Sequence, residues 1–386
     1  MERFLSAFVS EAQAGGQSLL VNIKIAVLPI AKVFTMCFLG FILASKYVNI
    51  LPASGRRLLN RLVFSLLLPC LIFSQLGQSI TMEKIFQWWF IPANIVLTAI
   101  SGSLIGLIVA SIVRPPYPFF KFTIVQIGIG NIGNVPLVII AALCRDESNP
   151  FGDSEKCSTC GIAYISFGQW VGAIIIYTYV YAMLTPPPEG TFDIKDESIP
   201  VKNLQKDHTP VLVPLLLQEI PSTYSDPSKR EEVLAMVMGV IPFFRRLIFT
   251  PDAPLFFFTD SCKILGGAMI PCILLALGGN LVEGPGNSKL GLRTTVAIIF
   301  ARLFLVPPTG LGIVMLADKL GFLPPDDKMF RFVLLLQHSM PTSILSSTVA
   351  TLRGCGRESA AILFWVHIFA IISMAGWLVL YLRILF

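Results

Sequence analysis

Charged residues are scarce in this chain. Asp, Glu, Lys and Arg make up 13% of its 386 residues, whereas soluble domains carry roughly 25%. Hydrophobic residues reach 54%, and the mean hydropathy is +0.75. A soluble core has no room for so much apolar surface, so lipid must solvate a large part of the chain. The net charge of +6 gives no reason to expect a nucleic-acid partner.

Enzyme signatures are also missing. The sequence has no H-E-x-x-H, no G-x-S-x-G and no P-loop, so neither an enzyme nor a cofactor is expected. Cys157 and Cys160 form the one C-x-x-C, and a zinc site would need two further ligands at suitable spacing. Free thiols and a lumenal Cys144–Cys157 disulfide both remain open.

Apolar stretches long enough to cross a bilayer, about 20 residues each, occur ten times. This predicts an all-α integral membrane protein of ten transmembrane helices. Residues 1–22 show no cleavable signal peptide, so the first span is expected to serve as the signal. The predicted spans are 23–45, 58–78, 88–113, 119–144, 161–184, 233–249, 257–280, 293–316, 329–352 and 360–385.

A polar segment, residues 185–232, divides the chain into two halves of five spans. Its Pro-, Lys-, Asp- and Ser-rich composition predicts a disordered linker. Pro69 and Pro271, like Pro136 and Pro341, lie about 200 residues apart, which indicates a duplication. An odd number of spans inverts the second copy. The predicted parts are therefore one five-helix repeat (1–184), the linker, and an inverted repeat (233–386) whose first helix is shortened.

Both termini are then expected on one side of the membrane and the linker on the other. The short loops of the two sides carry similar numbers of Lys and Arg, so the positive-inside rule has to rely on the linker itself. Its lysines favour a cytosolic linker and lumenal termini.

Two of the predicted spans contain matching proline interruptions. The first reads Gln126-Ile-Gly-Ile-Gly-Asn-Ile-Gly-Asn-Val-Pro136, and the second reads Leu336-Gln-His-Ser-Met-Pro-Thr-Ser343. A helix broken in the bilayer is tolerated mainly where its loose ends line a cavity, and paired breaks are typical of carriers. We expect half-helices that begin near Pro136 and Pro341, whose N-terminal dipoles bind a carboxylate without a fixed cation.

The residues expected to bind the substrate lie at these two breaks. Amides and hydroxyls would orient the anion, and aliphatic side chains would face its apolar part. The candidates are Asn131, Asn134, Val135, Pro136, Gln337, His338, Ser339, Pro341 and Ile344.

Simpler roles remain open for several polar groups. The prolines would also fit plain kinks, and His338 would fit either a hydrogen bond to a neighbouring helix or proton coupling. Gln169 and Trp170 would fit the cavity wall or ordinary packing. Lys32 and Arg302 lie inside predicted spans, where ionisable groups are functional candidates unless they reach the interface.

The motifs around these breaks resemble the plant PIN-LIKES carriers of the auxin efflux carrier superfamily. The resemblance rests on G-N-I-G-N-V-P-L at 130–137, on Ile270-Pro-Cys272 with Gly278-Gly-Asn-Leu281, and on Gln337-His-Ser-Met-Pro-Thr-Ser343. It implies ten spans in two inverted five-helix repeats, with broken helices 4 and 9 crossing. It also implies a scaffold of spans 1, 2, 6 and 7 and a moving part formed by the other six.

The same resemblance implies a multi-pass protein of the endoplasmic reticulum membrane that carries auxin (indole-3-acetic acid) and forms a homodimer through its scaffold. The alternative is a proton- or sodium-coupled transporter of another organic anion. Coupling usually requires intramembrane carboxylates, and spans 4 and 9 contain none, which favours uniport by alternating access.

Overall fold

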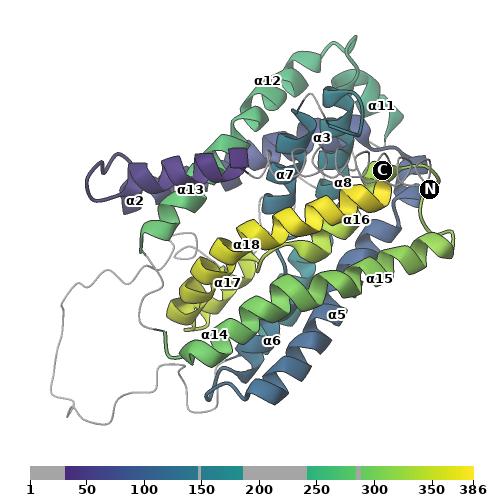
Figure 1. Cartoon of the computed structure of the whole chain (residues 1–386). Coiled ribbons are helices and arrows are strands. Elements are labelled where there is room, and N and C mark those ends of the chain that lie inside the picture. The colour runs from purple at the N-terminus through teal and green to yellow at the C-terminus, as the bar shows by residue number, and fades with distance from the viewer. Residues whose placement is uncertain (1–30, 147–148, 186–240, 284–287) are drawn as a thin grey trace, which may run out of the picture.

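The computed structural model describes residues 31–146, 149–185, 241–283 and 288–386, and these are almost entirely helical (Figure 1). Residues 186–232 of the predicted linker lie outside the described residues. In chain order after a helix at Ala31–Ala44, the α-helices are α2 (Ala53–Leu62), α3 (Leu68–Ser79), α4 (Met82–Gln87), α5 (Phe90–Val113), α6 (Phe120–Gly128), α7 (Asn134–Cys144), α8 (Ser154–Ile175), α9 (Tyr181–Met183), α11 (Pro242–Phe244), α12 (Phe256–Gly267), α13 (Met269–Asn280), α14 (Gly291–Phe300), α15 (Val306–Lys319), α16 (Lys328–Ser339), α17 (Ile344–Leu352) and α18 (Gly356–Leu385).

Six continuous helices are long and apolar enough to cross a membrane, and they confirm six of the ten predicted spans. Several of these helices contain a π-helical turn that joins two α-helical parts, as at Ala301–Leu305 between α14 and α15. Two more predicted spans, 119–144 and 329–352, are each split into two helices. The predicted spans 23–45 and 233–249 lie partly outside the described residues. The six helices are Ala53–Ser79, Met82–Val113, Ser154–Met183, Phe256–Gly279, Gly291–Lys319 and Gly356–Leu385.

Short polar side chains mark where several helices begin. The Asp153 side chain accepts from the Lys156 N–H (2.8 Å) and opens α8. Asp327 does the same for α16 by accepting from the Phe330 N–H (2.8 Å). Each cap satisfies one of the backbone donors that a helix N-terminus leaves unpaired.

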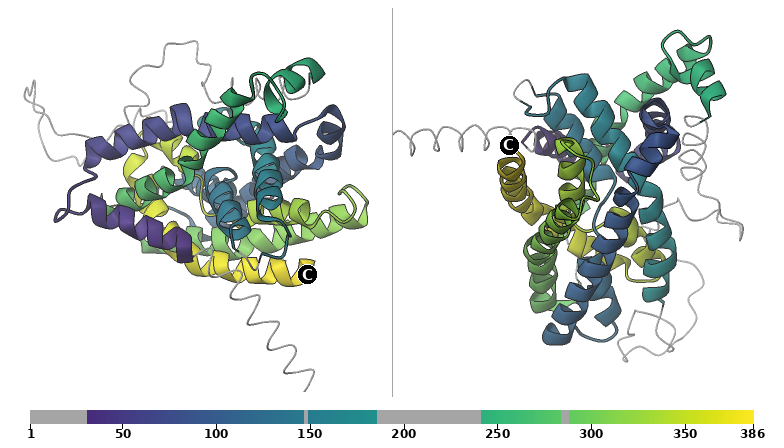
Figure 2. Two further views of the ribbon diagram at one scale, coloured as in Figure 1. Left: turned by 90° about the horizontal axis from the view of Figure 1, so that it is seen from above. Right: turned by 90° about the vertical axis from the view of Figure 1, so that its right-hand side faces the viewer.

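The helices fall into two groups according to what they touch. In the first group, α3 packs on α12 and α2 packs on α13. In the second, α5 packs on α6, α14 and α15, and α16 packs on α15 and α18 (Figures 1 and 2). Because α8 packs both on α3 and on α5, it joins the two groups.

Within the first group, the helix Ala31–Ala44 and α13 come into backbone contact. A Cβ atom added at Gly278 would overlap the Cys37 carbonyl oxygen, and one added at Gly40 would overlap the Leu275 carbonyl oxygen. Small residues that allow such an approach are typical of helix contacts in membranes, where close packing drives association. Glycine is therefore required at both positions.

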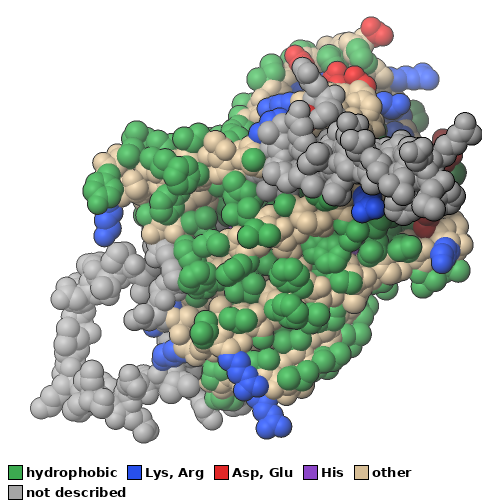
Figure 3. All heavy atoms as spheres, in the orientation of Figure 1, with side chains coloured by type: hydrophobic (Ala, Val, Ile, Leu, Met, Phe, Trp, Pro, Cys, Tyr) green, Lys and Arg blue, Asp and Glu red, His purple; other side chains and the backbone are tan. Residues whose placement is uncertain are grey.

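Large apolar side chains face outward across α14, α15 and α18 on the face that Figure 3 shows. Leu292, Ile372 and Ile112 are exposed over 80%, 76% and 67% of their surface. Soluble proteins rarely present contiguous apolar surface of this extent. Lipid is the solvent that such a surface requires.

The start of the first described helix and the C-terminus lie at the same end of the molecule. Lys32 forms an ion pair with Asp146 just after α7 (2.9 Å). The ring of Phe386 packs on Phe151, 5.3 Å between centroids, in the same α7–α8 loop. The Lys263–Glu155 pair (2.7 Å) also connects α12 to the start of α8, so two ion pairs join the two helix groups here.

Candidate functional site

Both proline-containing breaks are present. The first separates α6, which ends at Gly128, from α7, which begins at Asn134. The second separates α16, which ends at Ser339, from α17, which begins at Ile344. Met340 is extended (φ −71°, ψ 148°), as expected for a residue that precedes proline.

Both half-helices begin near the expected prolines, although neither begins at the proline itself: α7 begins at Asn134 and α17 at Ile344. Pro136 is the third residue of α7, where its missing N–H leaves no helical hydrogen bond unmade. Pro341 lies before α17 in the extended segment, because its carbonyl is used in pairing with the other break.

The two breaks lie side by side and pair through their main chains. The Asn131 N–H donates to the Pro341 carbonyl (2.8 Å), and the Ser343 N–H donates to the Ile129 carbonyl (3.0 Å). Gly130 and Thr342 thereby form an antiparallel bridge. These bonds satisfy backbone groups that the breaks would otherwise leave unpaired in lipid. We call residues 129–133 and 340–343 the crossing.

Side chains of the crossing cap the two helices that leave it. Asn131 Oδ1 accepts from the Val135 N–H at 3.5 Å, at the start of α7. Ser343 Oγ accepts from the Ser346 N–H (3.3 Å) at the start of α17. Two helix N-termini, each carrying about half a positive charge, are thus anchored at one place.

A fixed cation lies at the crossing, where the sequence predicted helix N-termini alone. Arg302 belongs to the π-helical turn Ala301–Leu305 and is fully buried. Its Nε donates to the Met340 carbonyl (2.8 Å), and its Nη1 donates to the carbonyls of Ile127 (3.0 Å) and Gly128 (3.3 Å). The guanidinium therefore binds the C-terminal ends of both α6 and α16.

Several buried polar atoms around the crossing have no hydrogen-bond partner within the described part of the chain. Native proteins leave few such atoms, and each one points to strain, a ligand or a water molecule. The unpartnered atoms in this region are Gln126 Nε2 and Oε1, Asn131 Nδ2, Gln169 Oε1, Arg302 Nη2 and Gln337 Nε2.

Gln337 and His338 lie at the end of α16 and bond to α5 rather than to the other break. Asn94 Nδ2 donates to Gln337 Oε1 (2.9 Å), and Asn94 Oδ1 lies 3.0 Å from His338 Nε2. Thr98 Oγ1 is also within hydrogen-bond distance of the His338 ring (3.2 Å to Nε2). The hydrogen-bonding role considered for His338 is therefore the one that the structure shows.

A small cavity lies beside the crossing, between α5, α8 and the first break. Its volume is about 20 Å³, which is room for about one water molecule. A larger ligand therefore needs the walls to separate. The lining residues are Ile95, Thr98, Ala99, Gly128, Ile129, Gly130, Ile132, Gly172, Ile175 and Ile176.

The side chains of four other residues that the sequence predicted for the site, Asn134, Val135, Ser339 and Ile344, take no part in the contacts described above. Asn134 is buried as the first residue of α7, and the Ser339 hydroxyl donates to the Leu336 carbonyl of its own helix (3.0 Å). Val135 and Ile344 are half-buried, and neither of them lines the cavity. Its apolar wall comes instead from isoleucines of α5, α8 and the first break.

Sequence reasoning missed Asn94, Thr98 and Gln126 and left Arg302 undecided. Asn94 and Thr98 lie four residues apart in a predicted span, so they share one helix face. Gln126, a polar residue inside a predicted span and two positions before Gly128, was a similar signal, because a polar group in a bilayer needs a partner.

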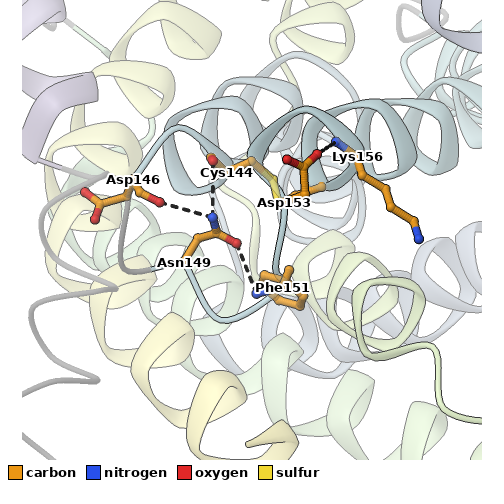
Figure 4. The surroundings of a disulfide bond; sticks show 7 residues. Cys144, Asp146, Asn149, Phe151, Asp153 and Lys156 are labelled. Carbon is orange, nitrogen blue, oxygen red and sulfur yellow. Dashed lines mark hydrogen bonds between the residues drawn. A yellow bond between two sulfur atoms is a disulfide. The ribbon is translucent and has the colours of Figure 1, made fainter.

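The α7–α8 loop is closed by a disulfide between Cys144 and Cys157 (Figure 4). Cys160 is a free thiol. The Asn149 side chain forms hydrogen bonds within this loop. Its Nδ2 donates to the Asp146 carbonyl (3.1 Å), and its Oδ1 accepts from the Phe151 N–H (3.1 Å). Of the two alternatives for these cysteines, the structure contains the disulfide.

Removing this disulfide is expected to destabilise the protein. The bond closes a loop across a sequence separation of 13 residues, and closing a loop of about that length stabilises by about 3 kcal/mol in the chain-entropy model. Cys144→Ser combined with Cys157→Ser should therefore lower the melting temperature in detergent, whereas Cys160→Ser should not. Equal melting of the double variant and the unchanged protein would show that the bond contributes nothing.

A family model described as membrane transport protein matches residues 25–378. Protein PIN-LIKES 6 of Arabidopsis thaliana is 67% identical over 414 aligned residues, which cover 97% of this chain and 96% of that protein. The chain belongs to the PIN-LIKES family of membrane transport proteins.

Other PIN-LIKES relatives from Arabidopsis thaliana match over nearly their whole length. PIN-LIKES 2 is 38% identical, with 95% of this chain and 96% of that protein covered. PIN-LIKES 7 is 32% identical, with 94% and 98% covered. The alignment to PIN-LIKES 6 is longer than this chain, so that relative has residues without a counterpart here. The family resemblance expected from the motifs is confirmed.

Proposed function

We propose that this chain carries an organic monoanion, with the auxin indole-3-acetate as its cargo, and holds the carboxylate at the crossing. The observation that carries the proposal is the buried, unpartnered Asn131 Nδ2 beside two helix N-termini. Helix N-termini favour anions, and an amide N–H adds a donor directed at a carboxylate oxygen.

The sequence of the crossing supports an anion rather than a cation. No Asp or Glu occurs in α6, α7, α16, α17 or the residues that join them. Intramembrane carboxylates are the usual mark of proton relays and of ion pathways. We therefore propose uniport of the anion down its electrochemical gradient.

The full architecture that we propose has ten spans in two inverted repeats and moves by alternating access. The antiparallel pairing of Gly130 with Thr342 fits two breaks related by an approximate two-fold axis. The helix group containing α3, α12 and α13 serves as the scaffold and as the homodimer contact. The remaining helices carry the crossing, and movement between the groups opens the cavity.

We propose that the protein resides in the endoplasmic reticulum with its termini in the lumen. The Cys144–Cys157 disulfide supports this orientation, because disulfides persist in oxidising compartments. The disulfide loop lies at the same end as Phe386. An acceptor site for N-glycosylation appended after Phe386 should be modified, and one placed within residues 186–232 should not. The opposite pattern would overturn the orientation.

Uptake of labelled indole-3-acetic acid into vesicles that contain the protein tests the cargo. We expect uptake above that of empty vesicles, and competition by unlabelled indole-3-acetate but not by indole-3-acetamide. Asn134→Ala and Pro341→Ala should reduce the uptake, while Asn49→Ala, at an exposed turn, should not. Uptake at the level of empty vesicles for all variants would refute auxin as the cargo.

A further inference from the structure

We propose that Arg302 supplies the net positive charge of the crossing, and that this charge makes the site select a monoanion over its neutral amide. The inference rests on the proposed function in one respect, the location of the ligand at the crossing. It does not depend on which carboxylate is carried.

The charge of Arg302 is not balanced by a carboxylate in the described ranges. Ion pairs such as Lys32–Asp146, Lys263–Glu155 and Arg331–Asp318 occur in the described ranges, and none of these three involves Arg302. A buried charge without a counterion is costly, and this cost is usually offset by a partner or a function. Arg302 is fully buried and bonded to neutral carbonyls, so its positive charge remains for a ligand to neutralise.

The helix dipoles at the crossing indicate how much charge remains. The C-terminal ends of α6 and α16 each contribute about half a negative charge, and the N-termini of α7 and α17 each contribute about half a positive charge. Without Arg302 these four ends would sum to about zero. The guanidinium binds both C-terminal ends and brings the crossing to about one positive charge, which matches one carboxylate.

The guanidinium is also held in place. Its Nη2 occupies the space in which a side chain at residue 130 would begin. The π-helical turn that presents Arg302 is braced by α18, since Ser373 Oγ (2.8 Å) and Trp377 Nε1 (3.0 Å) both donate to the Leu303 carbonyl. Nη2 itself has no partner within the described residues. One nitrogen of an immobilised guanidinium therefore lacks a hydrogen-bond partner within the described residues, next to the Gly130–Thr342 pair.

A purely structural role makes a different prediction from a charge role. If Arg302 only connects the ends of α6 and α16, lysine cannot replace its planar guanidinium. Arg302→Lys should then reduce the preference for anions nearly as much as Arg302→Gln does. If its charge attracts the ligand, lysine should preserve the preference for anions and glutamine should abolish it.

Thermal melting of the purified full-length protein, with graded concentrations of paired ligands, separates the two roles. The pairs are indole-3-acetate with indole-3-acetamide, benzoate with benzamide, and butyrate with butyramide. Ligand binding to the folded state raises the melting temperature by mass action, so apparent affinities follow from the shifts. We expect the unchanged protein to bind at least one anion tenfold or more tightly than its amide. Arg302→Lys should keep this preference within about threefold, and Arg302→Gln should lose it.

Three results would overturn the inference: an unchanged anion preference in Arg302→Gln, equal loss of that preference in Arg302→Lys and Arg302→Gln, or no anion preferred over its amide by the unchanged protein.

If Arg302→Gln yields no folded protein, Gly130→Ala replaces it in the experiment, because the added methyl group displaces the guanidinium without removing its charge. That variant should weaken anion binding more than amide binding, and equal effects would also overturn the inference. Arg302-dependent binding of benzoate or butyrate without indole-3-acetate would refute the proposed cargo alone.

Discussion

Asn131→Asp is expected to reduce uptake of the anion at least 100-fold while leaving the fold intact. The substitution keeps the shape of the side chain and the oxygen that caps α7. A carboxylate at a helix N-terminus is favourable for stability. It also places a negative charge where the substrate carboxylate is proposed to bind, and two like charges about 4 Å apart repel by about 4 kcal/mol at an effective dielectric constant of 20.

The measurement is vesicle uptake together with the melting temperature of the same preparation. Asn49→Asp is the matched control, because Asn49 is exposed in a turn with positive φ (46°) that Asp also tolerates. Loss of uptake with unchanged or raised melting temperature would support the site. Normal uptake by Asn131→Asp would remove Asn131 from it.

Gly278→Val is expected to abolish most of the folded protein. A Cβ at this position would overlap the Cys37 carbonyl oxygen, and the backbone cannot move aside as a side chain can. The helix Ala31–Ala44 and α13 would have to separate, and overpacking of this kind typically costs 1–3 kcal/mol and sometimes more. The monodisperse peak in size-exclusion chromatography should fall to a minor fraction.

Gly267→Val provides the control for helix propensity and hydrophobicity. Gly267 lies in α12, is exposed, and has no atom within 4 Å of an added Cβ. Its substitution should leave the size-exclusion peak unchanged. Equal yields of the two variants would mean that the close approach at Gly278 is not required for folding.

The apolar helices and the two breaks are the features that sequence reasoning could place. Long apolar runs are explicit in the sequence, and Gly, Asn and Pro in mid-run weaken a helix through known backbone preferences. The first residues of the half-helices were harder to place. Rules for proline treat one helix at a time, whereas the extended segment before α17 is fixed by main-chain pairing with residues more than 200 positions away.

The polar partners of the crossing could not be placed from the sequence for a related reason. Arg302 bonds to carbonyls of residues 127, 128 and 340, and Asn94 bonds to Gln337. Nothing local in the sequence marks these distant pairs. The sequence shows Arg302 as a charge within a predicted span, but it does not distinguish a side chain that reaches the membrane interface from one that reaches the crossing.

The main-chain pairing at the crossing has a consequence for substitutions in the residues around it. Since Asn131 with Pro341 and Ser343 with Ile129 bond through backbone atoms, the junction survives many changes in the side chains that surround it. Substitution of the isoleucines that line the cavity is therefore expected to change the shape of that cavity while leaving the main-chain pairing between the two breaks in place.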